Sequence, residues 1–234
     1  MERPQLLPGV ELHVADEFRE RPRSYEQTDH RGGPVTAATA STVPTLDLEP
    51  AARRLAALLP AIRAEQLADP TPCPDFTVAA LLDHLMGLTT AFTDAAHKTP
   101  AGGGPPVPSA AHLDPDWRTE LPDRLAALVT AWREPAAWEG ETEAGGVVLP
   151  AQVHGVVALN EIVVHGWDLA RATRQRFSVD AASAAACLEF CSSFAQGEAV
   201  DGLFGPAVPV GEGAPVFHQV LGYAGRDPRW SPNG

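Results

Sequence analysis

Residues 160–173, "NEIVVHGWDLARAT", place a carboxylate and an imidazole four residues apart inside a mostly apolar run. Because an α-helix turns about 100° per residue, Glu161 and His165 project from one face of it. The remaining faces are apolar, which is typical of a helix buried inside a bundle. Buried polar groups need partners. The pattern predicts a helix from about Pro150 to Ala172 whose polar stripe faces something inside the protein.

Two interpretations of this stripe are open from the residues alone. A Glu and a His one turn apart often form a solvated surface pair, but they can also chelate one metal ion. A metal site needs a third ligand, and His84 in "LLDHLMG" lies at the edge of the apolar face of an earlier helix. His84 is either an ordinary edge histidine or the third ligand. The metal hypothesis therefore names His84, Glu161 and His165.

Two more polar residues share the stripe. His154 lies two turns before Glu161, about 10 Å along the axis, which is too far to join one coordination sphere comfortably. We consider it a candidate catalytic residue that orients substrate or shuttles a proton. Asp168 either accepts the imidazole N–H of His165 or pairs with a neighbouring Arg such as Arg171. Outside the stripe, Cys73 in "PTPCPDF" is a further and weaker candidate for a catalytic or ligating role.

Hydrophobic periodicity predicts an all-α protein. Residues 1–43 are rich in Arg, Glu, Pro and Thr without periodicity and predict a disordered extension, followed by one domain over residues 44–234. Pro60 is expected to bend the first helix or mark its weak point, and Thr77 to cap the second. The expected helices cover about 47–67, 78–98, 119–134, 150–172 and 180–198, with a short one after Pro215, while 135–150 is expected to be a loop.

The composition narrows the possible partners. The formal net charge of -13 argues against nucleic acid and anionic membrane surfaces as partners. No run approaches the roughly 20 apolar residues of a membrane span, and the start of the chain has no apolar signal core. Three cysteines make a poor disulfide framework. We expect a soluble cytoplasmic protein, with the oligomeric state open between a monomer and a homodimer.

Four segments of the chain resemble a known family. "TPCPDFTVAALLDHLMG" (71–87), "EIVVHGWDLARAT" (161–173), "FGPAVPV" (204–210) and "LGYAGRDPRW" (221–230) resemble the DinB-like metal-binding helical bundles of actinobacteria. More narrowly, they resemble the N-terminal domain of mycothiol-dependent maleylpyruvate isomerase and its stand-alone relatives. The resemblance extends over roughly residues 46–230.

The resemblance implies an up-down-down-up four-helix bundle with extra C-terminal helices and an irregular tail. It implies a divalent metal, usually zinc and otherwise nickel or iron, held by His84, Glu161 and His165. Two departures from the family pattern are Phe76, where Trp is common, and Arg174, where Gly normally closes the helix. We expect the sterol-carrier-like second domain of the isomerase to be missing, because too little chain follows Ser178 to form one, and this weakens transfer of the isomerase activity itself.

Two functions from different classes follow from this resemblance. Three protein ligands on zinc leave one position open, where a thiol would be deprotonated or a water activated. The first function is therefore an enzyme of the mycothiol transferase or isomerase type, which adds a small thiol to an electrophilic metabolite. The second is a non-catalytic metal-binding protein whose ion stabilises the bundle. A plain bundle without metal is a third, weaker hypothesis.

Overall fold

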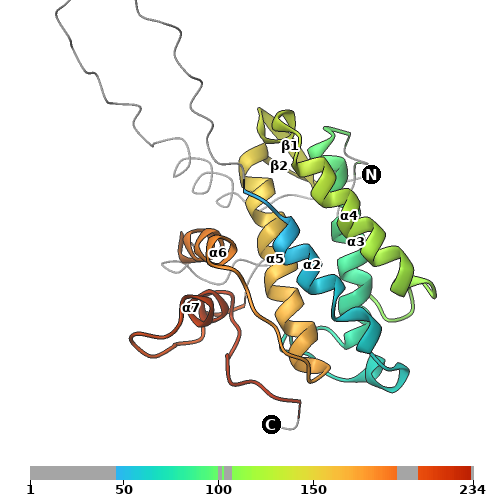
Figure 1. The fold of residues 1–234 in the computed structure, drawn as a ribbon, viewed down its shortest axis with the longest axis vertical. Coiled ribbons are helices and arrows are strands. Elements are labelled where there is room, and N and C mark those ends of the chain that lie inside the picture. Colours follow the sequence, from blue (N-terminus) through green and yellow to red (C-terminus); the bar gives the residue numbers. More distant parts are fainter. Residues whose placement is uncertain (1–45, 100–101, 103–106, 194–204, 233–234) are drawn as a thin grey trace, which may run out of the picture. The chain divides into compact units, whose positions relative to one another are not determined.

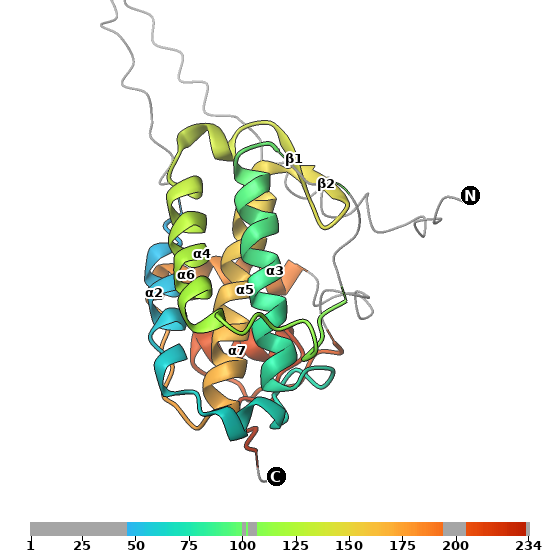
Figure 2. The same cartoon turned by 90° about the vertical axis from the view of Figure 1, so that its right-hand side faces the viewer.

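Four helices form the bundle in a computed structural model that describes residues 46–99, 102, 107–193 and 205–232. The bundle helices are α2 (Glu49–Ala56), α3 (Val78–Ala96), α4 (Trp117–Trp132) and α5 (Ala151–Ala172), shown in Figure 1. Helix α3 packs against α4 and α5, and α2 packs against the same two helices. Figure 2 shows α3 and α4 running in one direction and α2 and α5 in the other. This is the up-down-down-up order expected above, whereas the extension over residues 1–43 lies outside the described residues.

Local signals set the helix boundaries. The Thr77 hydroxyl accepts the backbone N–H of Ala80, so the predicted cap of α3 is confirmed. Helix α2 ends at Ala56 because Pro60 has no N–H to bond the Ala56 carbonyl. Two short 3₁₀ helices, η1 (Leu59–Ala61) and η2 (Ala64–Ala68), continue the chain. Pro60 thus marks the weak point of the first helix, but the α-helix is shorter than predicted and covers only Glu49–Ala56.

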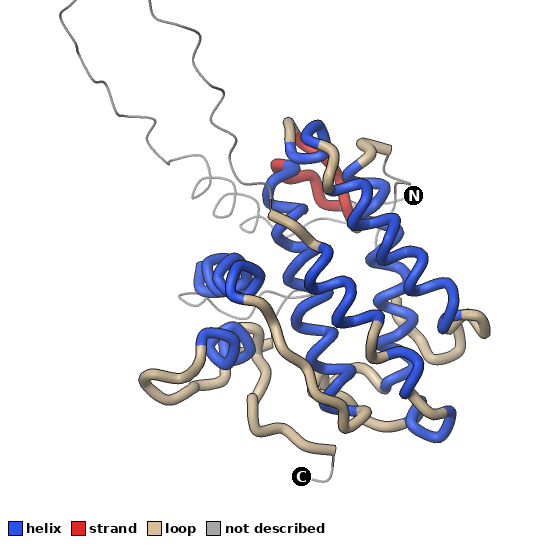
Figure 3. Tube along the Cα trace, viewed as in Figure 1, coloured by secondary structure: helices blue, strands red, loops and turns tan. Residues whose placement is uncertain are grey.

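The prediction of a loop over residues 135–150 was wrong. A 3₁₀ helix, η3 (Pro135–Trp138), is followed by the antiparallel strands β1 (Glu141–Ala144) and β2 (Val147–Pro150). Gly145 and Gly146 join the strands with φ angles of 60° and 82°, the backbone that a two-residue hairpin turn requires. Figure 3 shows the hairpin in red at one end of the bundle. The Gly-Gly pair was the signal for this hairpin.

Two further helices follow the bundle. Helix α6 (Ala181–Ser193) packs against α5, and α7 (Val216–Tyr223) packs against α6. Between α5 and α6, Arg174 has a positive φ of 58°, and the N–H of Gln175 bonds the Ala170 carbonyl. This is the hydrogen-bond pattern of a glycine-terminated helix. Arg174 therefore adopts the left-handed backbone conformation that Gly normally takes at this position in the family. The helix end is well defined despite this departure from the family pattern.

The core of the bundle is built mainly from leucines on the inward faces of the four helices. Leu82, Leu85, Leu121, Leu128 and Leu159 are completely buried. Such close packing fixes α3 against α5, and this contact positions the polar residues described next. No helix among the described residues combines the length and apolar character needed to cross a bilayer.

Candidate metal centre

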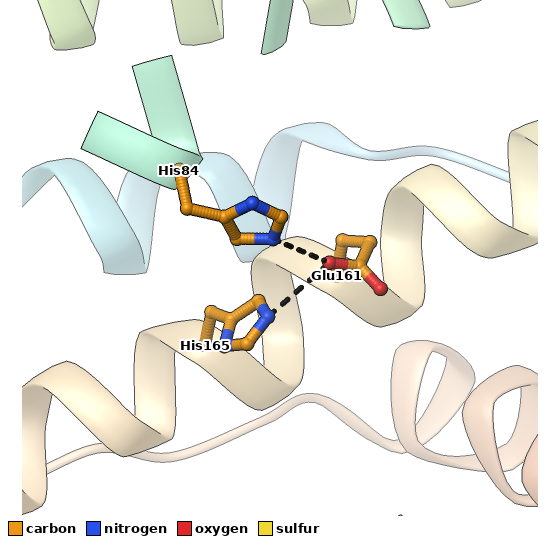
Figure 4. Close-up of side chains that lie close together, drawn as sticks. All are labelled: His84, Glu161 and His165. Carbon is orange, nitrogen blue, oxygen red and sulfur yellow. Dashed lines mark hydrogen bonds and ion pairs between the residues drawn. The ribbon is translucent and has the colours of Figure 1, made fainter. Parts of the chain in front are cut away.

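Three side chains from two helices converge at the interface of α3 and α5 (Figure 4). One carboxylate oxygen of Glu161, Oε2, lies 3.2 Å from Nε2 of His84 and 3.2 Å from Nε2 of His165. The two imidazole rings meet edge to face, with centroids 4.9 Å apart and planes at 86°. Among the described residues, this is the group of His, Cys, Asp and Glu whose donor atoms all lie within 4.8 Å of one another. The structure thus brings together the three residues named from the sequence, which we call the triad.

The triad is set into the bundle, and its three side chains are covered to different degrees. The side chain of His165 is 8% exposed, that of Glu161 is 15% exposed and that of His84 is 27% exposed. Exposure therefore increases from α5 towards α3. His84 is therefore the member of the triad whose side chain is most exposed.

The spacing of the donor atoms fits a small divalent ion. Zinc bonds imidazole nitrogen and carboxylate oxygen at about 2.0–2.2 Å, so two donors at a tetrahedral centre lie about 3.4 Å apart. The observed 3.2 Å contacts from Glu161 to each histidine are close to this separation. Two imidazoles and one carboxylate are also a donor set that zinc, nickel and iron accept. All donor atoms of the triad lie within 4.8 Å of one another, and any pair wider than about 3.4 Å would move closer together to hold such an ion.

Asp168 and Arg226 hold His165 from the side away from Glu161. Nδ1–H of His165 donates to Oδ2 of Asp168 at 3.0 Å, and this bond keeps Nε2 directed at Glu161. Asp168 is fully buried and also accepts a bond of 3.1 Å from Nη2 of Arg226. The alternative partner, Arg171, instead donates to the carbonyl of Trp230. Asp168 is therefore placed to orient an imidazole.

These contacts shift the protonation of the triad. Burial disfavours the charged form of Glu161, but hydrogen bonds from His165 and His84 outweigh it and hold the pKa of this carboxyl well below its usual range. Burial also opposes a charge on His165, yet the bonds to Asp168 and Glu161 raise its pKa to about 9. Without a metal, the positive charge of protonated His165 balances the negative charges of the surrounding carboxylates. A metal ion would replace this proton as the positive charge.

His154 does not join the triad. It lies near the start of α5, where its Nε2–H donates to the carbonyl of Val147 in the hairpin at 3.2 Å. Its ring also lies 6.1 Å from that of Phe92, and burial lowers its pKa. These contacts attach the hairpin to α5. The catalytic role considered for His154 stays a prediction.

The three cysteines are free thiols, of which Cys187 and Cys191 are buried and Cys73 is partly exposed. Burial raises the pKa of Cys73 to about 11 and that of Cys191 to about 12, so both are protonated at neutral pH. Cys191 donates a hydrogen bond of 3.1 Å to the side-chain oxygen of Asn160, and Cys187 is fully buried one turn away. The cysteines on α6 are core residues, as the sequence indicated.

Sequence reasoning missed two residues beside the triad. Arg226 lies in the tail, which was expected to be mostly irregular, and no local pattern shows that its guanidinium reaches Asp168. Phe76 was noted only as a departure from the family pattern, but its ring centroid lies 5.3 Å from that of His84 and 6.2 Å from that of His165. The signal for Arg226 was the buried acid at Asp168, which needs a positive partner from elsewhere.

Comparison with known proteins gives two findings. A model of the mycothiol maleylpyruvate isomerase N-terminal domain matches residues 48–170. Two curated relatives are uncharacterized proteins of Mycobacterium tuberculosis, one from strain CDC 1551 / Oshkosh and one from strain H37Rv, and each is 31% identical over 136 residues. This stretch is 53% of the present chain and 64% of each relative, so the match spans less than two thirds of their length. No solved structure matches the chain.

The family match covers more than half of the chain and includes α2, α3, α4 and most of α5. It therefore contains every residue of the triad, together with Asp168. Arg226 lies beyond it, in the C-terminal part of the chain. The helical order and this match agree that the chain belongs to the family of the mycothiol maleylpyruvate isomerase N-terminal domain.

Proposed function

We propose that this protein binds a divalent metal, zinc in the first instance and otherwise nickel or iron, through His84, Glu161 and His165. We further propose that it uses the metal as an enzyme of the thiol transferase or isomerase type. The observation that carries the proposal is the convergence of three donor atoms from two helices within 4.8 Å of one another.

An open coordination position favours a reactive site over a purely structural one. Structural zinc sites take four protein ligands, whereas catalytic sites keep one position for substrate or water. In the described part of the chain, no fourth His, Cys, Asp or Glu joins the group. Asp168, the nearest alternative, is already bonded to His165 and Arg226.

Small thiols are the substrate class that membership of this family favours, since the family is named after a mycothiol-dependent isomerase. A divalent ion at this site would lower the pKa of a coordinated thiol and so supply a thiolate at neutral pH. The chain's own cysteines are protonated and lie outside the triad, so the reacting thiol would come from solution. We propose mycothiol as co-substrate and a small electrophilic metabolite as acceptor.

The role of the protein residues follows from their contacts. Asp168 fixes the tautomer of His165, so that Nε2 faces the metal position. Glu161 contributes the negative charge that compensates a divalent ion in a half-buried site. His84, the most exposed member of the triad, borders the side from which thiol and acceptor would enter.

A non-catalytic metal-binding protein is the second candidate. The triad joins α3 to α5, so an ion held there would cross-link two helices and stabilise the bundle. In this case the protein would bind metal as predicted but would not accelerate the reaction of any thiol.

The first experiment measures metal content. The untagged protein is incubated with zinc, desalted and analysed by mass spectrometry, alongside His165→Ala and the control His154→Ala from the same helix. We expect about one zinc per chain in the parent and in His154→Ala, and a large loss in His165→Ala. Absence of zinc, nickel and iron from the parent would overturn the proposal.

The second experiment separates the two candidates. The zinc-loaded parent and the metal-free protein are mixed with mycothiol and a panel of small electrophiles, and thioether formation or isomerisation is followed by chromatography. Acceleration that needs zinc supports the enzyme. A protein that binds zinc stoichiometrically but accelerates none of these reactions supports the structural role.

A further inference from the structure

The two histidines of the triad are held in different ways. His165 bonds Glu161 through Nε2 and Asp168 through Nδ1, so both ring nitrogens are fixed. Within the described residues, His84 has one hydrogen bond, from Nε2 to Glu161. Its side chain is also more than three times as exposed, 27% against 8%. A metal ligand usually has an outer partner that fixes its ring, and for His84 no hydrogen bond supplies one.

Phe76 occupies the place beside His84. Its ring centroid lies 5.3 Å from that of His84 with an interplanar angle of 38°, within the range of favourable aromatic pairs. It also reaches the ring of His165, at 6.2 Å and 49°. The three rings thus contact one another beside the donor atoms.

The loop before α3 holds Phe76 firmly. The N–H of Phe76 bonds the Cys73 carbonyl at 3.0 Å. The Thr71 hydroxyl lies 2.9 Å from both the Phe76 and the Cys73 carbonyl oxygens, which share its one proton. Pro70 and Thr77 form a β-bridge that closes the loop, and Thr77 caps α3. The backbone at Phe76 is therefore bonded on both sides. Because its backbone is fixed, Phe76 presents its ring at a defined place beside His84, where it can restrain the imidazole.

We propose that Phe76 is a positioning residue that holds the His84 imidazole in its metal-binding orientation by ring packing, as Asp168 holds His165 by a hydrogen bond. This inference rests on the proposed metal binding. Without the Phe76 ring, His84 samples more rotamers, and the ordering of its side chain opposes metal binding. An aromatic pair of this kind corresponds to about a 3- to 10-fold change in affinity.

The affinity test compares the full-length parent with Phe76→Leu, Phe76→Trp and the control Phe92→Leu. Phe92 lies on α3, the helix that carries His84, but its ring lies near His154 and not near the triad. Zinc and cobalt dissociation constants are measured by competition with a chromophoric chelator. We expect Phe76→Leu to bind about 3- to 10-fold more weakly, and Phe76→Trp and Phe92→Leu to stay within about twofold of the parent, below that range.

A second readout needs no metal. Imidazole ¹⁵N–¹H spectra of the metal-free protein report the tautomer and motion of each histidine ring. Phe76→Leu should broaden or shift the signals of His84 and leave those of His154 unchanged, which a general loss of stability would not do. The free energy of unfolding is measured for each variant, so that a folding defect is recognised.

The outcomes distinguish the two proposals. A parent that binds metal, with Phe76→Leu of equal affinity and unchanged His84 signals, overturns the role of Phe76 alone. A parent that binds neither zinc nor cobalt overturns the proposed function and this inference with it. If Phe92→Leu weakens binding as much as Phe76→Leu, the effect is general packing and the inference is wrong.

Discussion

His165 and His154 lie on the same helix and on the same polar stripe, yet their surroundings are opposite. His165 is placed between the carboxylates of Glu161 and Asp168, which raise its pKa to about 9 in spite of burial. His154 faces the Val147 carbonyl and the ring of Phe92, and burial lowers its pKa. Position on a helix face predicts burial, but the chemistry of each histidine depends on which other elements reach it. The predictions below use this contrast, from the largest effect to the smallest.

Removal of the shared carboxylate should have the largest effect. Glu161→Gln keeps the shape of the side chain but removes the charge that faces both histidines of the triad. Because even outer partners of metal ligands contribute about 10- to 100-fold, we expect zinc affinity to fall by more than about 100-fold. The measurement is chelator competition. His154→Gln, the control from the other end of the stripe, should bind zinc as the parent does. Equal losses of zinc affinity in both variants would contradict the contrast between His165 and His154.

Loss of the Asp168 carboxylate, which orients His165, should have the second-largest effect. Asp168→Asn weakens the bond to Nδ1 of His165 and leaves Arg226 buried without its counter-charge. We expect zinc affinity to fall about 10- to 100-fold and the free energy of unfolding to fall by about 3–5 kcal/mol. Chelator competition measures the zinc affinity, and urea titration measures the free energy of unfolding.

Asp83 provides the matched control for this variant. It precedes His84 in the chain, but its carboxylate accepts the backbone N–H of Ser109 at 2.9 Å. Asp83→Asn should leave zinc affinity nearly unchanged. If Asp168→Asn has no larger effect than Asp83→Asn, Asp168 does not orient His165.

Zinc should stabilise the fold through the triad. A ligand that binds only the folded state at 100 times its dissociation constant contributes about 2.7 kcal/mol. For a domain of this size we expect a rise in Tm of about 5–10 °C, reversed by a chelator. Thermal unfolding of His165→Ala should show no such rise. A zinc effect that is equal in His165→Ala would place the ion elsewhere.

The pH dependence of His154 should give the smallest effect. Its folded-state pKa lies below the ordinary value of 6.5 because burial disfavours the charged ring. The stability that depends on neutral His154 is therefore fully present above pH 6.5 and is lost as the pH falls through the folded-state pKa. Urea unfolding at several pH values should show parent stability falling faster in acid than that of His154→Gln. Parallel curves for the two proteins would show that His154 does not contribute.

The four-helix order and the triad were accessible from sequence because they depend on local periodicity and on a family resemblance. The spacing of Glu161 and His165 fixes their common face, and the match over residues 48–170 includes His84 on the facing helix. The break at Pro60 and the cap at Thr77 are also local effects. Both features can be predicted from a few neighbouring residues.

Other features needed the fold. The bond between Asp168 and Arg226 joins positions 58 residues apart, and no periodicity connects the tail to α5. The contact of Phe76 with His84 depends on how the loop closes through Thr71. The hairpin was missed because its acidic, glycine-rich composition outweighed the turn signal of Gly145 and Gly146. Long-range contacts of this kind decide which polar residues of a stripe become a site.

The coordination of the bound ion tests the central claim most directly. X-ray absorption at the zinc edge of the zinc-loaded parent should show nitrogen and oxygen ligands at about 2.0–2.1 Å, with the multiple scattering of two imidazoles. The same spectrum of His84→Ala should show one imidazole fewer. A sulfur ligand at about 2.3 Å would instead place zinc on a cysteine and contradict the assignment of His84, Glu161 and His165.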